Sequence, residues 1–270
     1  MVVISVVIPA LNDSAMLAMC LESLAAQTRP ADEIIVVDNG SVDDTADVAR
    51  RAGARVVTEP RRGIPAATAA GFDAARGTVI GRLDADSRPA ENWLAEIEAR
   101  FDADPSLSAL TGAGDFYGAN RAVIRLGEVL YIGGYFWSMG WLLGHPPLFG
   151  SNFAISQSAW NRIRETCHRD VRELHDDLDL SFQFGPGMKV EYDKNLRVGV
   201  SARPFGSFKG LGRRLYWAYT TIATNGREQS LLGRRAARKE WERVHRSADP
   251  TFAGEELGTS DFDGAEFGTD

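Results

Sequence analysis

The sequence predicts an α/β protein built on a mostly parallel, doubly wound sheet. Short apolar runs typical of buried strands alternate with helical stretches four times within the first hundred residues. Polar or charged residues directly follow each of these runs. Because parallel strands joined by helices all end at the same edge of a sheet, these polar residues should meet in one crevice, where open α/β sheets bind ligands.

The composition is that of a soluble globular chain with a sizeable core. The 270 residues are 44% hydrophobic and 25% charged. Two cysteines, Cys20 and Cys167, cannot form a disulfide framework, which indicates a reducing compartment. The apolar run at 2–8 lacks a basic flank and a cleavage site. It therefore predicts a first strand rather than a signal peptide, and the protein is expected in the cytoplasm.

The first four strands are expected at 2–8, 34–37, 55–58 and 78–83. Polar turns follow the first three of them, at 9–13, 38–41 and 59–63. A helix with apolar residues at helical spacing follows each of these turns, the second over 43–52 and the third, rich in alanine, ending at residue 75.

Asp84 and Asp86 follow the fourth strand with only Ala85 between them. If the backbone stays extended, both carboxylates point the same way and Ala85 points away. This geometry suits Mg²⁺ or Mn²⁺ held jointly by carboxylates and substrate phosphates. The alternative is an Asp-rich turn that caps a helix beginning near Pro89.

The acid after the second strand, Asp38, and the D-x-D sequence after the fourth together favour a nucleotide in the crevice. Each turn taken alone is equally well explained as helix capping. The chain has no G-x-G-x-x-G after the first strand and no Walker A lysine. These absences disfavour a dinucleotide-binding fold and a P-loop.

The second half is expected to hold a strand at 107–110 and two closing strands at 188–193 and 196–200. Residues 129–161 contain no Asp, Glu, Lys or Arg. Their aromatic-rich part, 129–143, is too short to span a bilayer, which needs about 20 apolar residues. It predicts either an interfacial helix or lipid-channel wall, or an ordinary buried helix followed by a loop.

Charge is segregated along the chain. Residues 203–246 hold eleven Lys and Arg against three acids, and 247–270 hold seven acids and no base. The net charge of −7 therefore leaves −8 for residues 1–202. The basic segment could bind the donor diphosphate, settle on anionic lipid headgroups or be a solvated helix face, whereas the acidic remainder disfavours nucleic acid. The expected divisions are a nucleotide-binding half at 1–110, an acceptor-side half of the same domain at 111–202, a basic helical segment at 203–246 and a disordered tail at 247–270.

An ordered set of motifs resembles those of family 2 glycosyltransferases, which have the GT-A fold. The resemblance covers most of residues 2 to 200, with Thr68-Ala69 where the family often has Arg-Asn. The motifs are Pro9-Ala10-Leu11-Asn12-Asp13, Val37-Asp38-Asn39-Gly40-Ser41, Arg62-Gly63, Leu83-Asp84-Ala85-Asp86, Gly150-Ser151-Asn152-Phe153-Ala154 and His175-Asp176-Asp177-Leu178-Asp179-Leu180.

The resemblance implies a nucleotide-sugar donor, usually UDP-linked, and Mn²⁺ or Mg²⁺ on its diphosphate. The metal would be held by Asp84 and Asp86, with Asp86 the stronger candidate for direct ligation. The donor would be bound by Pro9, Ala10, Leu11, Asp13, Asp38, Arg62, Gly63, Asp84 and Ala85.

By the same resemblance Asp177 is the catalytic base, and Gly150, Asn152 and Asp176 are placed on the acceptor side. Trp217 of the basic segment, which lies beyond the resemblance, is also expected on the acceptor side. An acceptor hydroxyl must lose its proton, and a carboxylate within about 3 Å can take it. The neighbouring acids favour raised proton affinity in one of them. The alternatives are a solvated helix start, or a His-Asp phosphohydrolase site, which needs further histidines on an all-helical scaffold.

The function expected from these observations is metal-dependent, inverting sugar transfer to a hydroxyl. A lipid or polyprenyl-type acceptor is favoured by the uncharged stretch between the donor and base motifs, with peripheral contact at the inner face of the plasma membrane. A soluble glycan or small-molecule acceptor is the alternative. A sugar nucleotidyltransferase would carry a Gly-rich basic loop after the first strand, and a non-catalytic scaffold would not need Asp84, Asp86 and Asp177 together.

Overall fold

A computed structural model describes residues 1–118, 132–203 and 208–246. Within these ranges the main sheet has seven strands in the order β3-β2-β1-β4-β8-β6-β9. The first four pair in parallel, β8 runs antiparallel to both of its neighbours, and β9 is parallel to β6. The strands are β1 Ile4–Ala10, β2 Glu33–Asp38, β3 Arg55–Thr58, β4 Val79–Arg82, β6 Leu107–Thr111, β8 Phe153–Ser156 and β9 Lys189–Tyr192.

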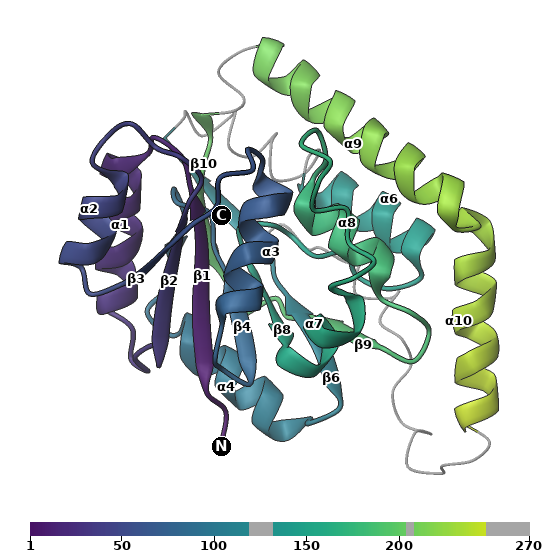
Figure 1. Cartoon of the computed structure of the whole chain (residues 1–270). Coiled ribbons are helices and arrows are strands. Elements are labelled where there is room, and N and C mark those ends of the chain that lie inside the picture. The colour runs from purple at the N-terminus through teal and green to yellow at the C-terminus, as the bar shows by residue number, and fades with distance from the viewer. Residues whose placement is uncertain (119–131, 204–207, 247–270) are drawn as a thin grey trace, which may run out of the picture.

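Helices cover both faces of this sheet (Figure 1), so the expected doubly wound α/β fold is confirmed. Side chains of β1 alternate between the two cores, because successive residues of a strand point to opposite faces. Val6 and Ile8 belong to the core under α1 and α4, whereas Val7 belongs to the core under α3 and α7. These helices are α1 Ser14–Ala25, α2 Thr45–Arg51, α3 Ile64–Ala74, α4 Trp93–Ala103 and α7 Gln157–Ile163.

Helix α3 lies unusually close to the sheet. A Cβ at Gly71 would overlap the Val7 side chain, and Val37 Cγ2 would be 2.8 Å away. Glycine at this position therefore lets the helix pack against β1 and β2. The close packing fixes where the N-terminal end of α3 meets the strand ends.

A second, smaller sheet was not expected from the sequence. It has the order β5-β10-β7, with β5 Arg88–Pro89, β7 Gly114–Tyr117 and β10 Val198–Ser201. The helix expected to begin near Pro89 exists but begins later, because residues 88–89 pair with β10 and Ala90 N donates to Arg197 O at 3.2 Å. Helix α4 begins at Trp93 instead. The two closing strands exist as predicted, but they belong to different sheets.

The remaining helices lie beside the last strands of the main sheet: α6 Gly134–Leu143, α8 Asp176–Gln183, α9 Phe208–Glu228 and α10 Leu231–Arg246. Figure 1 shows α9 running along the top of the molecule above α8, and α10 turning down beside α6. The described part of the basic segment from residue 208 onward is therefore helical. Residues 129–131 and the acidic tail at 247–270, on which two of the expectations rest, lie outside the described residues.

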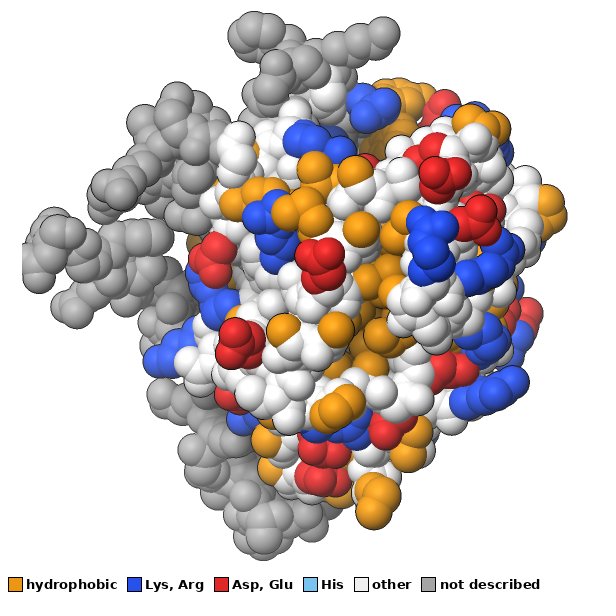
Figure 2. Space-filling view, turned by 90° about the vertical axis from the view of Figure 1, so that its left-hand side faces the viewer, with side chains coloured by type: hydrophobic (Ala, Val, Ile, Leu, Met, Phe, Trp, Pro, Cys, Tyr) orange, Lys and Arg blue, Asp and Glu red, His pale blue; other side chains and the backbone are white. Residues whose placement is uncertain are grey.

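Among the helices described, none combines the length and the apolar character needed to cross a bilayer. On the face seen in Figure 2, acidic and basic side chains are interspersed with apolar ones. Such a mixed surface differs from the continuous basic stripe of a nucleic-acid-binding protein. The expected lack of a nucleic-acid partner stays a prediction.

Candidate active site

One large cleft opens at the carboxyl edge of the parallel strands. Its volume is about 1210 Å³, which exceeds that of a typical small-molecule pocket. The ends of β1 and β4 and the start of α3 form one side, and α6, α8 and α9 form the other. The cleft is therefore large enough for two substrates at once.

Most of the donor residues predicted from the sequence line this cleft: Pro9, Ala10, Leu11, Asp13, Arg62, Gly63, Asp84 and Ala85. Asp38 does not line it, since its carboxylate accepts a hydrogen bond from Ser41 N at 2.9 Å within its own turn. Asn39 lines the cleft instead. Its side chain donates to Glu59 O at 2.8 Å and accepts from Gly63 N at 2.8 Å, which fixes the loop before α3.

Asp84 and Asp86 both line the cleft, but the backbone is not extended as expected: residues 85–86 form a turn in which Ser87 N donates to Asp84 O at 3.0 Å, and Ala85 lines the cleft as well. Asp84 accepts hydrogen bonds from Arg82 at 2.6 Å and from Ser151 Oγ at 2.5 Å. Burial opposes its ionisation, but the charge of Arg82 and the Ser151 hydrogen bond outweigh burial and lower the pKa of Asp84. Burial and the negative charge of Asp84 raise the pKa of Asp86.

Arg203 spans the rim of the cleft next to this pair. Its guanidinium contacts Asp86 Oδ2 at 2.9 Å and Asp13 Oδ2 at 3.0 Å. Both partners are residues that the sequence assigned to the donor side. Arg203 itself was not predicted, because nothing in the local sequence distinguishes it from the other arginines of the basic segment.

The acidic pair fits a divalent cation that is only partly held by protein. Within the described ranges, the remaining oxygen of Asp86, Oδ1, accepts no hydrogen bond, and no group of three or more His, Cys, Asp or Glu is gathered that could enclose a metal. The chain therefore offers two carboxylates beside open cleft volume. Mn²⁺ and Mg²⁺ bound by one or two carboxylates take their other ligands from substrate phosphates and water.

The side chain of Arg82 links Asp84 of the D-x-D motif to Asp176 at the start of α8. Its side chain is buried, with 1% of the residue exposed, and donates to Asp84 Oδ1, to the Gly150 carbonyl and, at 3.0 Å, to Asp176 Oδ2. A buried arginine without partners would be very unfavourable, so three acceptors stabilise the charge. Sequence reasoning missed Arg82, although an arginine inside an otherwise apolar strand was the available signal.

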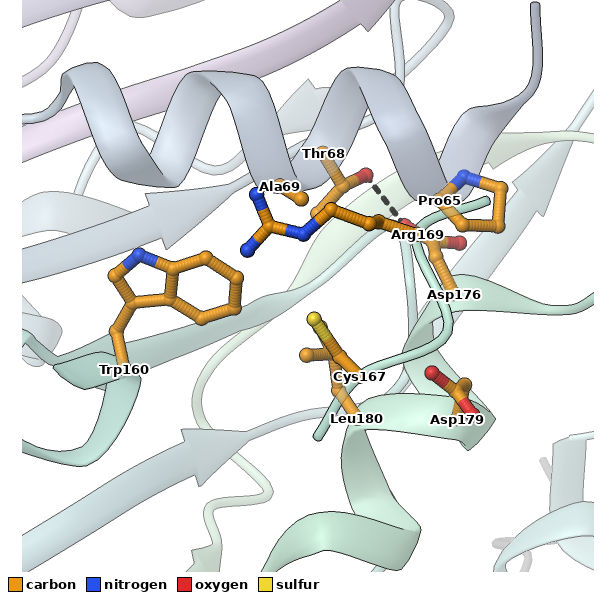
Figure 3. A pocket seen from close by; sticks show the side chains of 9 residues that line it. All are labelled: Pro65, Thr68, Ala69, Trp160, Cys167, Arg169, Asp176, Asp179 and Leu180. Atoms are coloured by element: carbon orange, nitrogen blue, oxygen red, sulfur yellow. Dashed lines mark hydrogen bonds between the residues drawn. The ribbon is translucent and has the colours of Figure 1, made fainter. Parts of the chain in front are cut away.

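The two acids at the start of α8 point in different directions. Both line the cleft, but Asp177 is partly exposed there, whereas the side chain of Asp176 is buried and accepts from Thr68 Oγ1 at 2.6 Å as well as from Arg82. Figure 3 shows Asp176 facing Thr68 of α3, with Asp179 also turned toward the small cavity of about 10 Å³ between α3, α7 and α8. Asp176 therefore positions α8.

Asp177 has the environment of a proton acceptor. Its carboxylate accepts from Gly150 N at 2.7 Å and from Leu178 N at 2.8 Å. Burial, and then the charge of Asp176, raise the pKa of Asp177, although Arg82 and the Gly150 N–H act in the opposite direction. A carboxylate with raised proton affinity that faces a cleft is a better base than an exposed one.

The residues predicted for the acceptor side are divided. Gly150, Asp176 and Trp217 line the cleft, but Asn152 does not. Asn152 is fully buried and accepts from Trp93 Nε1 at 2.8 Å while donating to the Ala113 and Leu196 carbonyls. Its amide therefore joins the two sheets.

Beyond Asp177 the cleft has an apolar arm between α6, α8 and α9. It is lined by Leu178, which forms a small core with Leu143 and Phe182, and by Tyr135, Met139 and Ile222, which pack against that core. Sequence analysis had allowed either a buried helix or a lipid-channel wall for this stretch. Helix α6 is partly buried and also borders the cleft, which agrees with a buried helix; its role as a lipid-channel wall stays a prediction.

Comparison with known proteins agrees with this arrangement. An uncharacterized glycosyltransferase of Mycobacterium tuberculosis is 39% identical over 104 residues, which cover 38% of this chain and 46% of the relative. Glycosyltransferase AglE of Haloferax volcanii is 30% identical over 126 residues, covering 43% of this chain and 38% of AglE. The chain thus matches less than half the length of these curated relatives.

Solved structures share the fold. A mannosyltransferase from Pyrobaculum calidifontis, PcManGT, in complex with GDP-Man and Mn²⁺, has a TM-score of 0.68 at 19% identity and covers 96% of this chain and 78% of its own. Glucosyl-3-phosphoglycerate synthase from Mycobacterium tuberculosis, in complex with Mn²⁺, UDP-glucose and phosphoglyceric acid, has a TM-score of 0.56 at 22% identity, with 83% and 79% covered. The sequence pattern of Glycosyl transferase family 2 matches residues 5–160, more than half of the chain. The chain therefore belongs to glycosyl transferase family 2.

Proposed function

We propose that the protein transfers a sugar from a nucleotide-sugar, with UDP favoured, to a hydroxyl of a lipid or polyprenyl-type acceptor, inverting the anomeric centre. The observation that carries the proposal is that Asp84, Asp86 and Asp177, far apart in sequence, line one cleft of about 1210 Å³. Cleft volume beyond the acidic motifs leaves room for the acceptor.

In this mechanism the acceptor hydroxyl oxygen bonds to the anomeric carbon, and Asp177 takes the proton that the hydroxyl loses. The bond from that carbon to the nucleotide diphosphate breaks in the same step, so the configuration inverts. Mn²⁺ or Mg²⁺, held by Asp84 and Asp86, would stabilise the negative charge on the departing diphosphate. Arg82 keeps Asp84 ionised and Asp176 in place, while the Gly150 N–H orients the Asp177 carboxylate.

A thermal-shift screen with UDP-, GDP- and dTDP-sugars, each with and without Mn²⁺, tests the enzyme class and the donor base together. The structural relatives were solved with GDP-Man and with UDP-glucose, so both donors belong in the screen. We expect a UDP-sugar with Mn²⁺ to raise the melting temperature most. A screen in which no nucleotide-sugar raises it would contradict the proposal.

The Asp86→Ala variant tests the metal assignment. We expect the variant to bind UDP at least about tenfold more weakly in the presence of Mn²⁺, because the metal loses a ligand. Titration calorimetry of UDP with and without Mn²⁺ measures this. The control is Asp115→Ala, which removes a half-exposed acid paired with Arg197 outside the cleft. Unchanged Mn²⁺ enhancement in Asp86→Ala would refute the assignment.

The lipid acceptor is supported by the apolar arm and by two exposed tryptophans beside it. Trp137 is 69% exposed and Trp141 54%, four residues apart on α6 and so on the same side of the helix. Arg235 of α10 lies over the Trp141 ring at 5.4 Å. Exposed indole rings beside cations are suited to an anionic membrane surface, here the cytoplasmic face.

Sedimentation with liposomes containing phosphatidylserine tests this part of the proposal. The protein should sediment with them, and the double variant Trp137→Ala/Trp141→Ala should not, because each indole contributes buried apolar area at the interface. Val42→Ala, at an exposed position before α2, is the control. Indifference of the native protein to liposomes would instead favour a soluble acceptor.

A further inference from the structure

A buried polar network holds α8 from the side opposite the cleft. Asp179 lies two residues after Asp177 on α8, so its side chain points away from the cleft and is 2% exposed. Both of its carboxylate oxygens bond His168: Oδ2 accepts from the backbone N at 2.8 Å, and Oδ1 contacts ring Nδ1 at 2.7 Å. This pairing attaches the loop after α7 to α8.

The same network reaches α9. Asn225, which is fully buried, donates to Asp179 Oδ1 at 2.8 Å, and Gln183 of α8 donates to Asn225 Oδ1 at 2.9 Å. The other ring nitrogen of His168, Nε2, contacts Glu228 at 3.1 Å. We call His168, Asp179, Asn225 and Glu228 the α8–α9 network.

Helix α9 also supplies a wall of the cleft. Trp217, Ala218 and Ile222 line it, and Asn225 lies two turns beyond Trp217 on the same helix. A second tie sits nearer the cleft, where His175 donates from its backbone N to Thr221 Oγ1 at 3.0 Å and its ring contacts the Arg214 carbonyl. Because helices are stiff over two turns, the position of Asn225 contributes, together with these contacts of His175, to where Trp217 stands relative to Asp177.

We infer that His168, Asp179 and Asn225 are positioning residues that set the cleft wall formed by α9 against the base Asp177. Of the proposed function, this inference uses only the role of Asp177 as the base. The network touches neither the donor residues nor the acidic D-x-D motif. Its loss should therefore affect transfer and leave donor binding unchanged.

The network is charged, and Asp179 and Asn225 within it are buried, whereas Glu228 is exposed. The hydrogen bond that the His168 ring donates to Asp179 raises the pKa of His168 to about 9, with burial acting in the opposite direction and Glu228 adding to the rise. The protonated ring can donate to both carboxylates at neutral pH. Replacing His168 leaves the buried carboxylate of Asp179 with fewer hydrogen-bond donors. This loss destabilises the fold more than the loss of an exposed ion pair would.

The experiment compares Asn225→Ala and His168→Gln with the native chain and with His245→Gln. His245 stacks on Trp241 of α10, so His245→Gln is the same substitution outside the network. Three measurements are made on each full-length protein: hydrogen–deuterium exchange, calorimetric binding of UDP with Mn²⁺, and the rate of UDP-sugar hydrolysis or transfer.

We expect exchange in α8 and in residues 212–225 to rise about tenfold or more in both network variants, with little change in β1, β2 and β4. Binding of UDP with Mn²⁺ should change less than twofold, while turnover falls about tenfold or more. The loss of turnover in the double variant should be smaller than the combined losses of the two single variants, since both substitutions act through Asp179.

Unchanged exchange in α9 would overturn the inference whether or not the protein turns over a sugar. A uniform rise of exchange across the whole sheet, or an equal loss of UDP binding, would also overturn it by showing a general loss of stability. If the native chain neither binds nor turns over any nucleotide-sugar, the proposed function fails, but the exchange measurement still decides whether the network positions α9.

Discussion

The carboxylate of Asp177 has both the exposure and the surroundings that a base requires. It faces the cleft, yet burial and the charge of Asp176 raise its pKa, so it holds a proton better than a carboxylate in water does. Gly150 N–H keeps it oriented, and a side chain at residue 150 would collide with it, since a Cβ there would lie 2.9 Å from Asp177 Oδ2. Glycine at 150 thus protects the geometry of the base.

Asp177→Asn should lower turnover by about 10²- to 10⁴-fold, the range that general base catalysis contributes. The amide cannot accept the hydroxyl proton, whereas the cleft keeps its shape. Turnover and calorimetric UDP binding with Mn²⁺ are measured together, and the binding should persist. Asp170→Asn, at an exposed acid paired with Arg61 in the neighbouring loop, is the control. Activity close to that of the native chain in Asp177→Asn would remove Asp177 from the mechanism.

Single residues of the site were predictable where a motif surrounds them. Asp84, Asp86 and Asp177 stand in recognisable patterns at strand or helix ends, and all three line the cleft. Arg82 and Arg203 have no such pattern, since their importance comes from partners up to 190 residues away. Asn152 fits a family motif, but burial between the sheets makes it a packing residue here.

At the scale of elements, hydrophobic periodicity identified the buried strands and the helices between them. Residues 4–10, 33–38 and 79–82 are strands close to the expected bounds. The short strand β5 was missed because two residues are too few to show a hydrophobic period. Only their pairing with β10 makes them a strand. Local sequence does not encode a partner more than a hundred residues away.

The packing of α3 on the sheet gives a test at this scale. Alanine is the better helix former by about 1 kcal/mol, but its Cβ at residue 71 would overlap Val7, so Gly71→Ala should destabilise the protein by about 1–3 kcal/mol. Gly212→Ala is the matched control, because it is also helical and has nothing within 4 Å. It should be neutral or stabilising in urea denaturation. Equal effects of the two substitutions would refute the packing argument.

The contact between α8 and α9 gives a second test, in which the stability of the fold is measured as a function of pH. The pKa of His168 is raised from 6.5 to about 9 in the folded state. A raised pKa means that the protonated ring stabilises the fold fully below pH 6.5, and that this stabilisation is lost as the pH rises through 9. Asp179 and Glu228 face the ring, and Cys167 in the same loop titrates later, with its pKa raised by burial to about 11.

Urea denaturation at a series of pH values measures the effect. The free energy of unfolding of the native chain should fall between pH 6.5 and 9.5, and His168→Gln should show a smaller fall. His245→Gln should follow the native curve. Identical curves for His168→Gln and the native chain would show that the His168 charge does not stabilise the fold.

For the whole molecule, the cleft is made from segments that the chain order keeps far apart. Asp13 and Asp86 come from the donor half, and Arg203 from the start of the basic segment meets both. In this arrangement the Arg203 guanidinium pairs with Oδ2 of Asp86, a carboxylate that is proposed to hold a divalent cation. A cation in the cleft must therefore compete with Arg203.

Arg203→Gln should consequently bind Mn²⁺ several-fold more tightly in the absence of nucleotide, because one competing charge is gone. Calorimetric titration with Mn²⁺ alone measures this. Stability should change by less than about 1 kcal/mol, since Arg203 is half exposed and exposed ion pairs contribute little. Arg243→Gln, which breaks the exposed pair with Glu240 on α10, is the control. Weaker Mn²⁺ binding in Arg203→Gln would mean that the arginine assists the cation instead.

The shared guanidinium of Arg82 also constrains how this sequence can diverge. One side chain neutralises Asp84 and Asp176, which come from opposite halves of the chain. A lineage that replaces the arginine leaves two acids uncompensated at once, and no single further substitution repairs both. Positions 82, 84 and 176 should therefore be inherited as a block, and homologues lacking the arginine should carry coordinated replacements at the other two.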